Sequence, residues 1–280
     1  MKKIKFCLKG FFAISLMGLV FLGCDSNNDA SGTSRVTVRM VDAPGDYDEV
    51  NVEVLDVLIK DNSDTGDQGW VSIGDALEVG PGKIYNLLDL TGGVTILLAD
   101  NLVPSGKLDQ IRLLLGDENS LMLKGATTTI PLKTPSAQQS GLKLKVNQTL
   151  EGGKTYEFLL DFDVEHSVVK AGNSGIYNLH PVIRVTTKEN TGGIKGKVVS
   201  PTPFPADFAV LVSIPVEGGI ISSYMNLETG EFLLSGVPAG KYTVTLDPGA
   251  DSAYAARIIE NTDVVNGSIT NVGDQTFILK

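Results

Sequence analysis

An alternation of apolar and polar side chains from Tyr156 to Glu165, interrupted only by Leu159, restricts this chain to a sheet-based fold more than any other feature. Side chains two residues apart point to the same face of a β-strand. One face of this segment therefore carries only large apolar groups: Tyr156, Phe158, Leu160, Phe162 and Val164. The other face is mostly acidic and includes Asp161 and Asp163. The pattern predicts a strand with an aromatic row in the core and an acidic row outside.

The same period of two recurs in short runs along the chain, with turn residues between them. Val36–Met40, Val50–Val54 and Leu142–Val146 each alternate between apolar and polar side chains. Glycine is abundant, with 31 residues, and few stretches repeat at helical spacing. We therefore predict an all-β protein made of two sandwich-like modules in tandem.

Two local features give less regular predictions. Glu151-Gly152-Gly153 is a turn signal, so we predict a hairpin that sets Lys143 and Lys145 beside the acidic row. Gly92-Gly93 interrupts the apolar run Leu87–Leu102. The segment Val94–Ala99 after it fits either a strand or a short helical turn that closes one end of a sandwich, and we favour the helical turn.

The amino terminus has the charge and length of a bacterial secretion signal. Residues 2–9 carry four lysines, and Gly10–Gly23 is apolar but too short to span a bilayer comfortably. The segment ends in Phe21-Leu22-Gly23-Cys24, which resembles the lipobox of bacterial lipoprotein signal peptides, with Phe21 in place of the more usual leucine. The resemblance implies that residues 1–23 are removed and that Cys24 carries a diacylglyceryl group, commonly with an N-acyl chain. An uncleaved anchor or an ordinary signal peptide with a chance cysteine are the alternatives.

Cysteine usage agrees with lipidation. The two cysteines are Cys7 and Cys24, so cleavage leaves only Cys24, and the mature chain can form neither a disulfide nor a thiolate metal cluster. Residues 24–34 contain no large apolar side chain, which predicts a flexible tether with a mean reach of about 15–20 Å. We expect a cell-envelope protein held by lipid on Cys24, in the outer membrane, on its periplasmic face or at the cell surface.

The charge of the chain excludes one class of partner. The formal net charge is −10, and removal of residues 1–23, which carry four lysines and no acid, takes it to about −14. An anionic surface repels nucleic acid, so we expect no nucleic-acid partner. We also expect no cofactor.

No catalytic motif is visible in the sequence. The only histidines are His166 and His180, and the chain lacks nucleophile-elbow, zinc-protease, phosphate-loop and dinucleotide signatures. We expect that the protein is not an enzyme. The alternative is an envelope hydrolase that uses acids such as Asp161 and Asp163.

Two acidic groups are weak candidates for a hard cation such as calcium. The first is Asp161 and Asp163, with Asp89 or His166, and the second is the turn cluster Asp42, Asp46 and Asp48. No calcium-loop spacing is present. We favour a charged strand face for the first group and ordinary turn chemistry for the second, and assign no metal site.

Several segments resemble a bacterial lipoprotein domain of unknown function. Two of them carry short motifs: Val38–Val54 contains D-A-P-G-D-Y-D, and Leu160–Val169 contains L-D-F-D and S-V-V. The other two are Ser140–Leu144 and Leu179–Val185. The resemblance covers residues 35–188. It implies a domain and a secreted setting, and it adds no active site.

Residues 192–280 show about seven short strand signals, the pattern of a small sandwich. Ile194–Val199 and Gly230–Val244, with V-P-A-G-K-Y, resemble the carboxypeptidase regulatory-like or prealbumin-like sandwich, which falls in the carbohydrate-binding-like fold group. Val103–Leu108 repeats the motif of Val237–Tyr242. The repeat means either that the first module contains a related sandwich or that both segments use the same type of turn before a strand.

These features favour a non-catalytic binding or assembly role at the cell envelope, with a glycan or a partner protein as ligand. A hydrolase or a purely structural spacer are the alternatives. Exposed aromatic rings often form sugar sites, and the candidates here are Trp70, Tyr47, Tyr177, Tyr224 and Tyr254. No planar platform is evident among them, and we favour core or rim positions for most of them.

Overall fold

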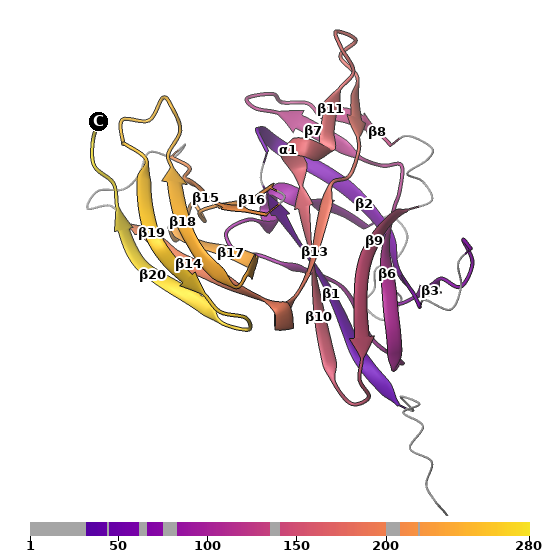
Figure 1. The fold of residues 1–280 in the computed structure, drawn as a ribbon. Coiled ribbons are helices and arrows are strands. Elements are labelled where there is room, and N and C mark those ends of the chain that lie inside the picture. The colour runs from indigo at the N-terminus through magenta and orange to yellow at the C-terminus, as the bar shows by residue number, and fades with distance from the viewer. Residues whose placement is uncertain are drawn as a thin grey trace, which may run out of the picture.

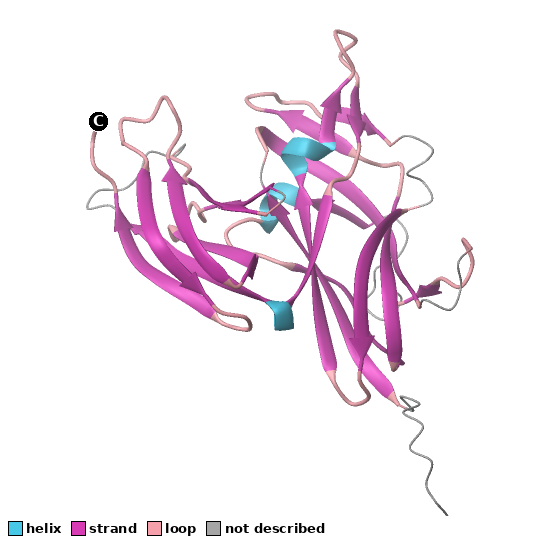
Figure 2. Cartoon of the chain, viewed as in Figure 1, coloured by secondary structure: helices cyan, strands magenta, loops and turns pink. Residues whose placement is uncertain are grey.

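Strands dominate the computed structural model of the chain, as predicted, and they form two modules (Figures 1 and 2). The structure describes residues 32–43, 45–61, 66–74, 83–134, 141–199, 208–217 and 219–280. Cys24 and the signal segment lie outside this range. No helix in the described part of the chain is long and apolar enough to cross a membrane.

One sheet of the first module has four strands, in the order β13-β10-β1-β5. Their bounds are Ile183–Thr187, Thr155–Asp163, Thr33–Ala43 and Ile96–Pro104. β1 and β10 run parallel, with Val38 opposite Phe158. β1 begins at Thr33, so the last two residues of the predicted tether belong to this strand, and Ser34 is fully buried.

The other sheet has nine strands. Seven form the path β11-β12-β8-β7-β2-β6-β9, and β3 and β4 pair with β2. In path order the seven are Val168–Lys170, Tyr177–Leu179, Ile130–Lys133, Ser120–Leu123, Tyr47–Lys60, Gly106–Leu115 and Leu142–Leu150. β3 and β4 span Val71–Ser72 and Lys83–Asn86.

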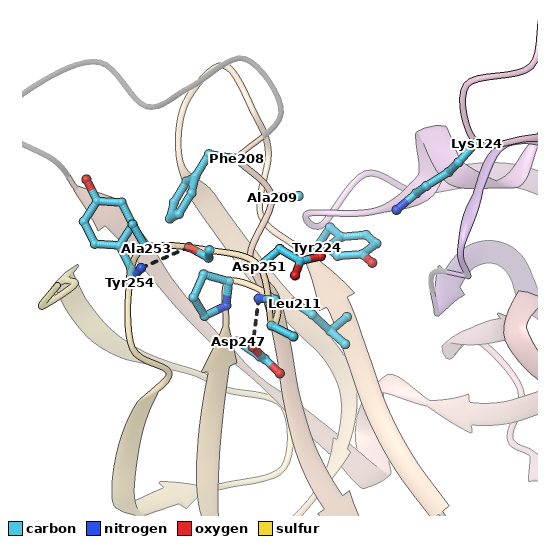
Figure 3. Close-up of a pocket in the computed structure, with 13 residues that line it drawn as sticks. Lys124, Phe208, Ala209, Leu211, Tyr224, Asp247, Asp251, Ala253 and Tyr254 are labelled. Atoms are coloured by element: carbon cyan, nitrogen blue, oxygen red, sulfur yellow. Dashed lines mark hydrogen bonds between the residues drawn. The ribbon is translucent and has the colours of Figure 1, made fainter. Parts of the chain in front are cut away.

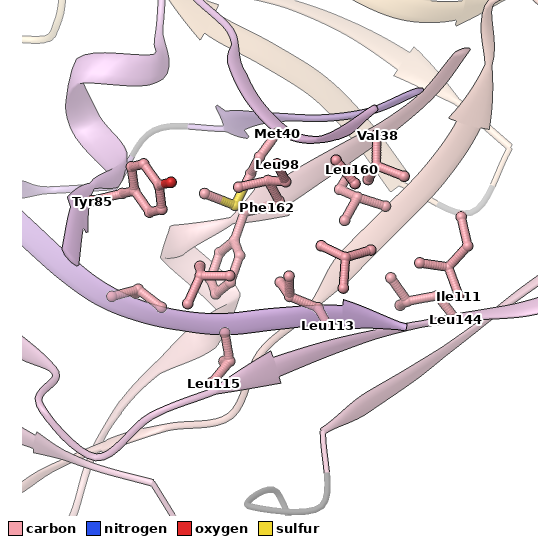
Figure 4. Packing of buried hydrophobic residues seen from close by; sticks show 14 of the residues in the cluster. Val38, Met40, Tyr85, Leu98, Ile111, Leu113, Leu115, Leu144, Leu160 and Phe162 are labelled. Carbon is pink, nitrogen blue, oxygen red and sulfur yellow. The ribbon is translucent and has the colours of Figure 1, made fainter. Parts of the chain in front are cut away.

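The two sheets enclose a core that the alternating pattern predicts. Phe158, Leu160 and Phe162 are fully buried. Leu160 and Phe162 lie on the side of Ile111 and Leu113 of the second sheet (Figure 4). Burial of each such side chain stabilises the fold by about 1.5–3 kcal/mol. The aromatic row predicted for β10 therefore lies in the core.

The second module is a seven-stranded sandwich with its own core around Val212, Phe232 and Val244. One sheet has the order β17-β14-β20, with bounds Glu231–Pro238, Thr191–Val199 and Ile269–Thr276. The other has the order β16-β15-β18-β19, with bounds Gly219–Tyr224, Leu211–Val216, Gly240–Asp247 and Arg257–Val264.

Both copies of the V-P-x-G-K motif lie where the chain changes sheets. β5 ends at Pro104 and β6 begins at Gly106, in different sheets of the first module. β17 ends at Pro238 and β18 begins at Gly240, again in different sheets. The hydroxyl of Tyr242 donates to the Pro238 carbonyl at 2.9 Å and closes the second corner.

The predicted hairpin between β9 and β10 is wrong. The turn at Gly152-Gly153 carries the chain from one sheet to the other, because both edges of β10 are taken by β1 and β13. Lys143 pairs with Asp67 at 2.7 Å instead of with the acidic row. A turn signal identifies a reversal of the chain, but the strand that pairs next is decided by tertiary packing.

The helical turn that we favoured for Val94–Ala99 is also wrong, because this segment enters strand β5. Leu98 and Ala99 are fully buried in the core. The helical turn precedes the glycines, as the 3-10 helix η2 (Leu87–Leu90), where the Asn86 side chain accepts from the Leu88 N–H at 3.3 Å. At the end of β10, Glu165 lies in the short helix α1 (Val164–Ser167) and not in the strand.

Candidate binding sites at the junction of the two modules

The Gly92-Gly93 turn of the first module docks directly on the second module. The N–H of Gly92 donates to the Ser223 hydroxyl at 2.8 Å. A Cβ on Gly93 would lie 2.8 Å from the Cβ of Leu233, closer than real side chains approach. The two glycines have φ values of +63° and +90°, which glycine adopts at little cost. The break seen in the sequence is therefore a contact point between modules.

Arg184 of β13 makes a second contact across the junction. Its guanidinium donates to the Gly236 carbonyl at 3.0 Å and pairs with Asp161 at 2.5 Å. Asp161 is only 8% exposed, and burial raises its pKa even though Arg184 opposes that shift. The acidic row of β10 is thus not a purely solvated face, because part of it is buried at the junction.

A pocket of about 570 Å³ opens at the junction, and we call it the aromatic pocket (Figure 3). The second module supplies Tyr224 at the end of β16, Asp247 at the end of β18, and the loop of residues 248–254. The first module supplies Lys124, whose amine points towards Tyr224 (Figure 3). The pocket therefore belongs mostly to the second module, and Lys124 is the lining residue that comes from the first.

Local contacts hold the walls of the aromatic pocket in place. The Tyr254 ring packs edge-to-face on Phe208, with 5.3 Å between centroids. Asp247 accepts from the Gly249 N–H at 2.8 Å, and Lys280 donates to the carbonyls of residues 250 and 253, each at 2.9 Å. Lys124 pairs with Asp46 at 2.6 Å, which raises the pKa of Lys124. The pocket is largely formed before a ligand arrives.

A second hollow, of about 590 Å³, adjoins the aromatic pocket at Leu211, and we call it the acidic cleft. Its charged lining consists of Asp161, Asp163, Glu165, His166, Arg184 and Glu217. Asp163 caps α1 by accepting from the His166 N–H at 3.0 Å and also contacts the His166 ring at 2.9 Å. This contact raises the pKa of His166. Ser167, the neighbour of His166, is buried, and its hydroxyl donates to the Asp163 carbonyl and accepts from the Val182 N–H.

The candidate cation ligands are dispersed. Asp46 pairs with Lys124, Asp48 accepts from the Gly125 N–H at 2.9 Å, and Asp89 is exposed on η2. Among the described residues, no three of the types histidine, cysteine, aspartate and glutamate form a group that could hold a metal ion.

Asp42 is buried within the first module. It is 2% exposed, and neither oxygen makes a hydrogen bond, although the Val164 N–H is near enough to lower its pKa slightly. Burial, with the charges of Asp161 and Asp163, raises the pKa of Asp42 well above its usual value.

Of the five aromatic candidates, two line the aromatic pocket and three do not. Tyr224 and Tyr254 line the aromatic pocket. The guanidinium of Arg112 covers the Trp70 ring at 4.0 Å from its centroid, Tyr177 is 8% exposed, and Tyr47 packs on the first core. No sequence pattern marked Lys124, Asp251 or Phe208 as pocket residues, because they come from separate loops.

Known structures resemble this chain only weakly. A cohesin–X-dockerin complex from Acetivibrio cellulolyticus shares 18% identity over 31% of this chain and 58% of that chain, with a TM-score of 0.24. The Bacillus anthracis TIE protein shares 14% over 88% of this chain and 34% of its own, with a TM-score of 0.21. The minor pilin GBS52 of Streptococcus agalactiae shares 10% over 87% and 97%, with a TM-score of 0.22. At identities of 18% or less and TM-scores of 0.24 or less, these likenesses establish no common function.

The comparison with curated proteins gives no match. A family match, in contrast, covers residues 33–181, which include both sheets of the first module except β13. This match spans more than half of the chain, and the chain therefore belongs to the family described as Domain of unknown function (DUF4382).

Proposed function

We propose that this protein is a lipid-anchored component of the cell envelope that binds a carbohydrate in the aromatic pocket without transforming it. One observation carries the proposal: Tyr224 and Tyr254, two of the five aromatic candidates, converge with Asp247, Asp251 and Lys124 in one pocket. A purely structural spacer would not require these side chains to converge in a pocket.

The chemistry of the lining suits a polyhydroxylated ligand. Tyrosine rings offer an apolar face together with a hydroxyl, and carboxylates accept hydrogen bonds from ligand hydroxyl groups. The volume of about 570 Å³ lies within the usual range for small-molecule sites, roughly 300–1,000 Å³. The resemblance of the second module to the carboxypeptidase regulatory-like sandwich, within the carbohydrate-binding-like fold group, points in the same direction.

The acids of the hydrolase alternative already have structural partners. Asp161 pairs with Arg184 at 2.5 Å, and Asp163 caps α1. A glycosidase needs two carboxyl groups that reach one bond of the substrate. These occupied positions favour binding over hydrolysis.

The position of β1 suits an anchor at Cys24. β1 starts at Thr33, at the end of the first module opposite α1 (Figure 1). The short tether between Cys24 and β1 would hold this end near the membrane. The junction would then face away from the anchored end, where a ligand can reach it.

A glycan array tests the ligand. The unlipidated mature chain (residues 25–280) is screened beside Tyr224→Ser and Asp251→Asn. We expect selective binding that both variants lose and that the matched control Asp274→Asn, on the exposed face of β20, retains. A silent array, or equal binding by all four proteins, would contradict the carbohydrate assignment.

Metabolic labelling tests the anchor. Labelled palmitate should enter the wild-type protein and not the Cys24→Ala variant. An unlabelled wild-type protein would show that Cys24 is not lipidated.

A further inference from the structure

We infer that the acidic cleft is a second binding surface, which takes a basic segment of a partner protein in which lysine or arginine alternates with aliphatic residues. The inference uses residues other than those of the aromatic pocket and does not depend on carbohydrate binding there.

The cleft has two opposed walls, one from each module. The first module contributes α1 and β13, with Glu165, His166 and Arg184. The second module contributes the hairpin of β15 and β16, with Glu217 and Ile220. The Arg184 bridge to Asp161 and Gly236 fixes one wall relative to the other. The cleft of about 590 Å³ therefore forms between the two modules when they are docked on each other.

The charge of the cleft is negative and partly unpaired. Asp161 is paired with Arg184, and Asp163 is paired with His166. Glu165 and Glu217 are exposed, one on each wall, and neither forms an ion pair with any residue that the structure describes. Two carboxylates outside these ion pairs, on opposite sides of a cleft whose acids outnumber its bases, complement a cationic ligand.

Aliphatic side chains accompany these acids. Val182 is 46% exposed on the first wall, and Ile220 is 66% exposed on the second. Exposed apolar groups with a polar rim mark interaction sites. Lysine and arginine bury their aliphatic stems on such groups while their charged heads reach nearby carboxylates. The lining thus fits a basic peptide segment better than it fits an isolated metal ion.

The charge of the cleft also depends on pH. Asp163 raises the pKa of His166, and burial raises the pKa of Asp161. The other charged groups that line the cleft are Glu165, Glu217 and Arg184. As the pH rises through the pKa of His166, the imidazole loses its positive charge and the cleft becomes more negative. Affinity for a cationic ligand should therefore increase from mildly acidic to mildly alkaline pH.

The test measures the fluorescence anisotropy of a labelled peptide of alternating lysine and leucine, titrated with the unlipidated mature chain. The variant Glu165→Gln/Glu217→Gln removes the two unpaired charges. The matched control Glu228→Gln/Glu260→Gln removes two exposed charges outside the cleft, so both proteins have the same net charge. We expect the cleft variant to bind about tenfold more weakly, or about 1.4 kcal/mol, and the control to stay within about twofold of the wild-type protein.

A second variant tests the apolar contact. Ile220→Ser should weaken binding about threefold to tenfold at about 0.5 M salt, where screening removes most of the charge contribution. Ile220 and both glutamates are exposed, so unchanged circular dichroism should confirm folding. Equal weakening by the two double variants would show diffuse attraction to an acidic protein and would overturn the proposal, as would the absence of binding. Glycan binding should be the same in all these variants. The outcome of this test is therefore independent of the outcome of the carbohydrate test.

Discussion

Replacing Arg184 by methionine should destabilise the junction between the modules, and the loss should depend on pH. The change removes the only ion pair formed by Asp161 among the described residues, and it removes the bond to the Gly236 carbonyl. Asp161 then remains buried with a charge and no partner. The variant keeps a side chain of similar length and apolar packing.

The structure sets the size of the effect. Removing one partner of a fully buried ion pair costs about 3–5 kcal/mol. The Arg184 side chain is 31% exposed and that of Asp161 is 10% exposed, so solvent screens part of this interaction. We expect a loss of about 1.5–3 kcal/mol at neutral pH.

The pH dependence follows from the pKa of Asp161, which burial raises. A carboxyl group with a raised pKa in the folded protein favours folding when protonated and opposes it when ionised. Without Arg184 this pKa should rise further. The loss should therefore shrink as the pH falls through that pKa and Asp161 takes up its proton.

Urea denaturation at about pH 7 and about pH 4, followed by circular dichroism, measures both effects. Trp70 is the only tryptophan and lies in the first module. Its fluorescence therefore reports the unfolding of that module, whereas circular dichroism reports the unfolding of both modules. The double variant Arg184→Met/Asp161→Leu should recover most of the loss, since position 161 then carries no buried charge. An equal loss at both pH values, or no recovery in the double variant, would refute the reasoning.

Two further substitutions probe buried features. Asp42→Leu should stabilise the protein by about 1–3 kcal/mol near neutral pH, because both carboxylate oxygens of Asp42 are buried without hydrogen bonds. The pKa of Asp42 is raised, so this gain should fall with decreasing pH in thermal melts, and a gain independent of pH would contradict the assignment. Gly93→Ala should cost about 1–3 kcal/mol more than Gly153→Ala, since both glycines have positive φ but only at position 93 would an added Cβ come within 2.8 Å of the Leu233 Cβ. Equal costs in denaturant melts would mean that Gly93 does not constrain docking.

Features encoded by neighbouring residues could be predicted from the sequence. The alternation in β10 placed Phe158 and Phe162 in the core, and this held because period two is a property of the strand itself. The pairing of β10 with β1 and not with β9 could not be read in this way, because it depends on contacts far apart along the chain. Asp161 shows the same limit, since residues of the second module, such as Ser222 and Leu233, lie around it.

The candidate sites were predicted only in fragments. Tyr224 and Tyr254 belonged to a group of five aromatic candidates that the sequence alone could not rank. Lys124 and Asp251 carried no signal, because one lies in a turn of the first module and the other in a loop of the second. Their convergence depends on how the modules dock, through contacts such as that of Gly92 with Ser223.

The central claim is that ligands bind where the two modules meet, and hydrogen exchange of the mature chain tests it most directly. With a glycan found on the array, we predict slower exchange at the aromatic pocket, in residues 124–126, 208–211 and 247–254 together. Slowing confined to one module, or located on the opposite faces around β9 and β20, would contradict the claim.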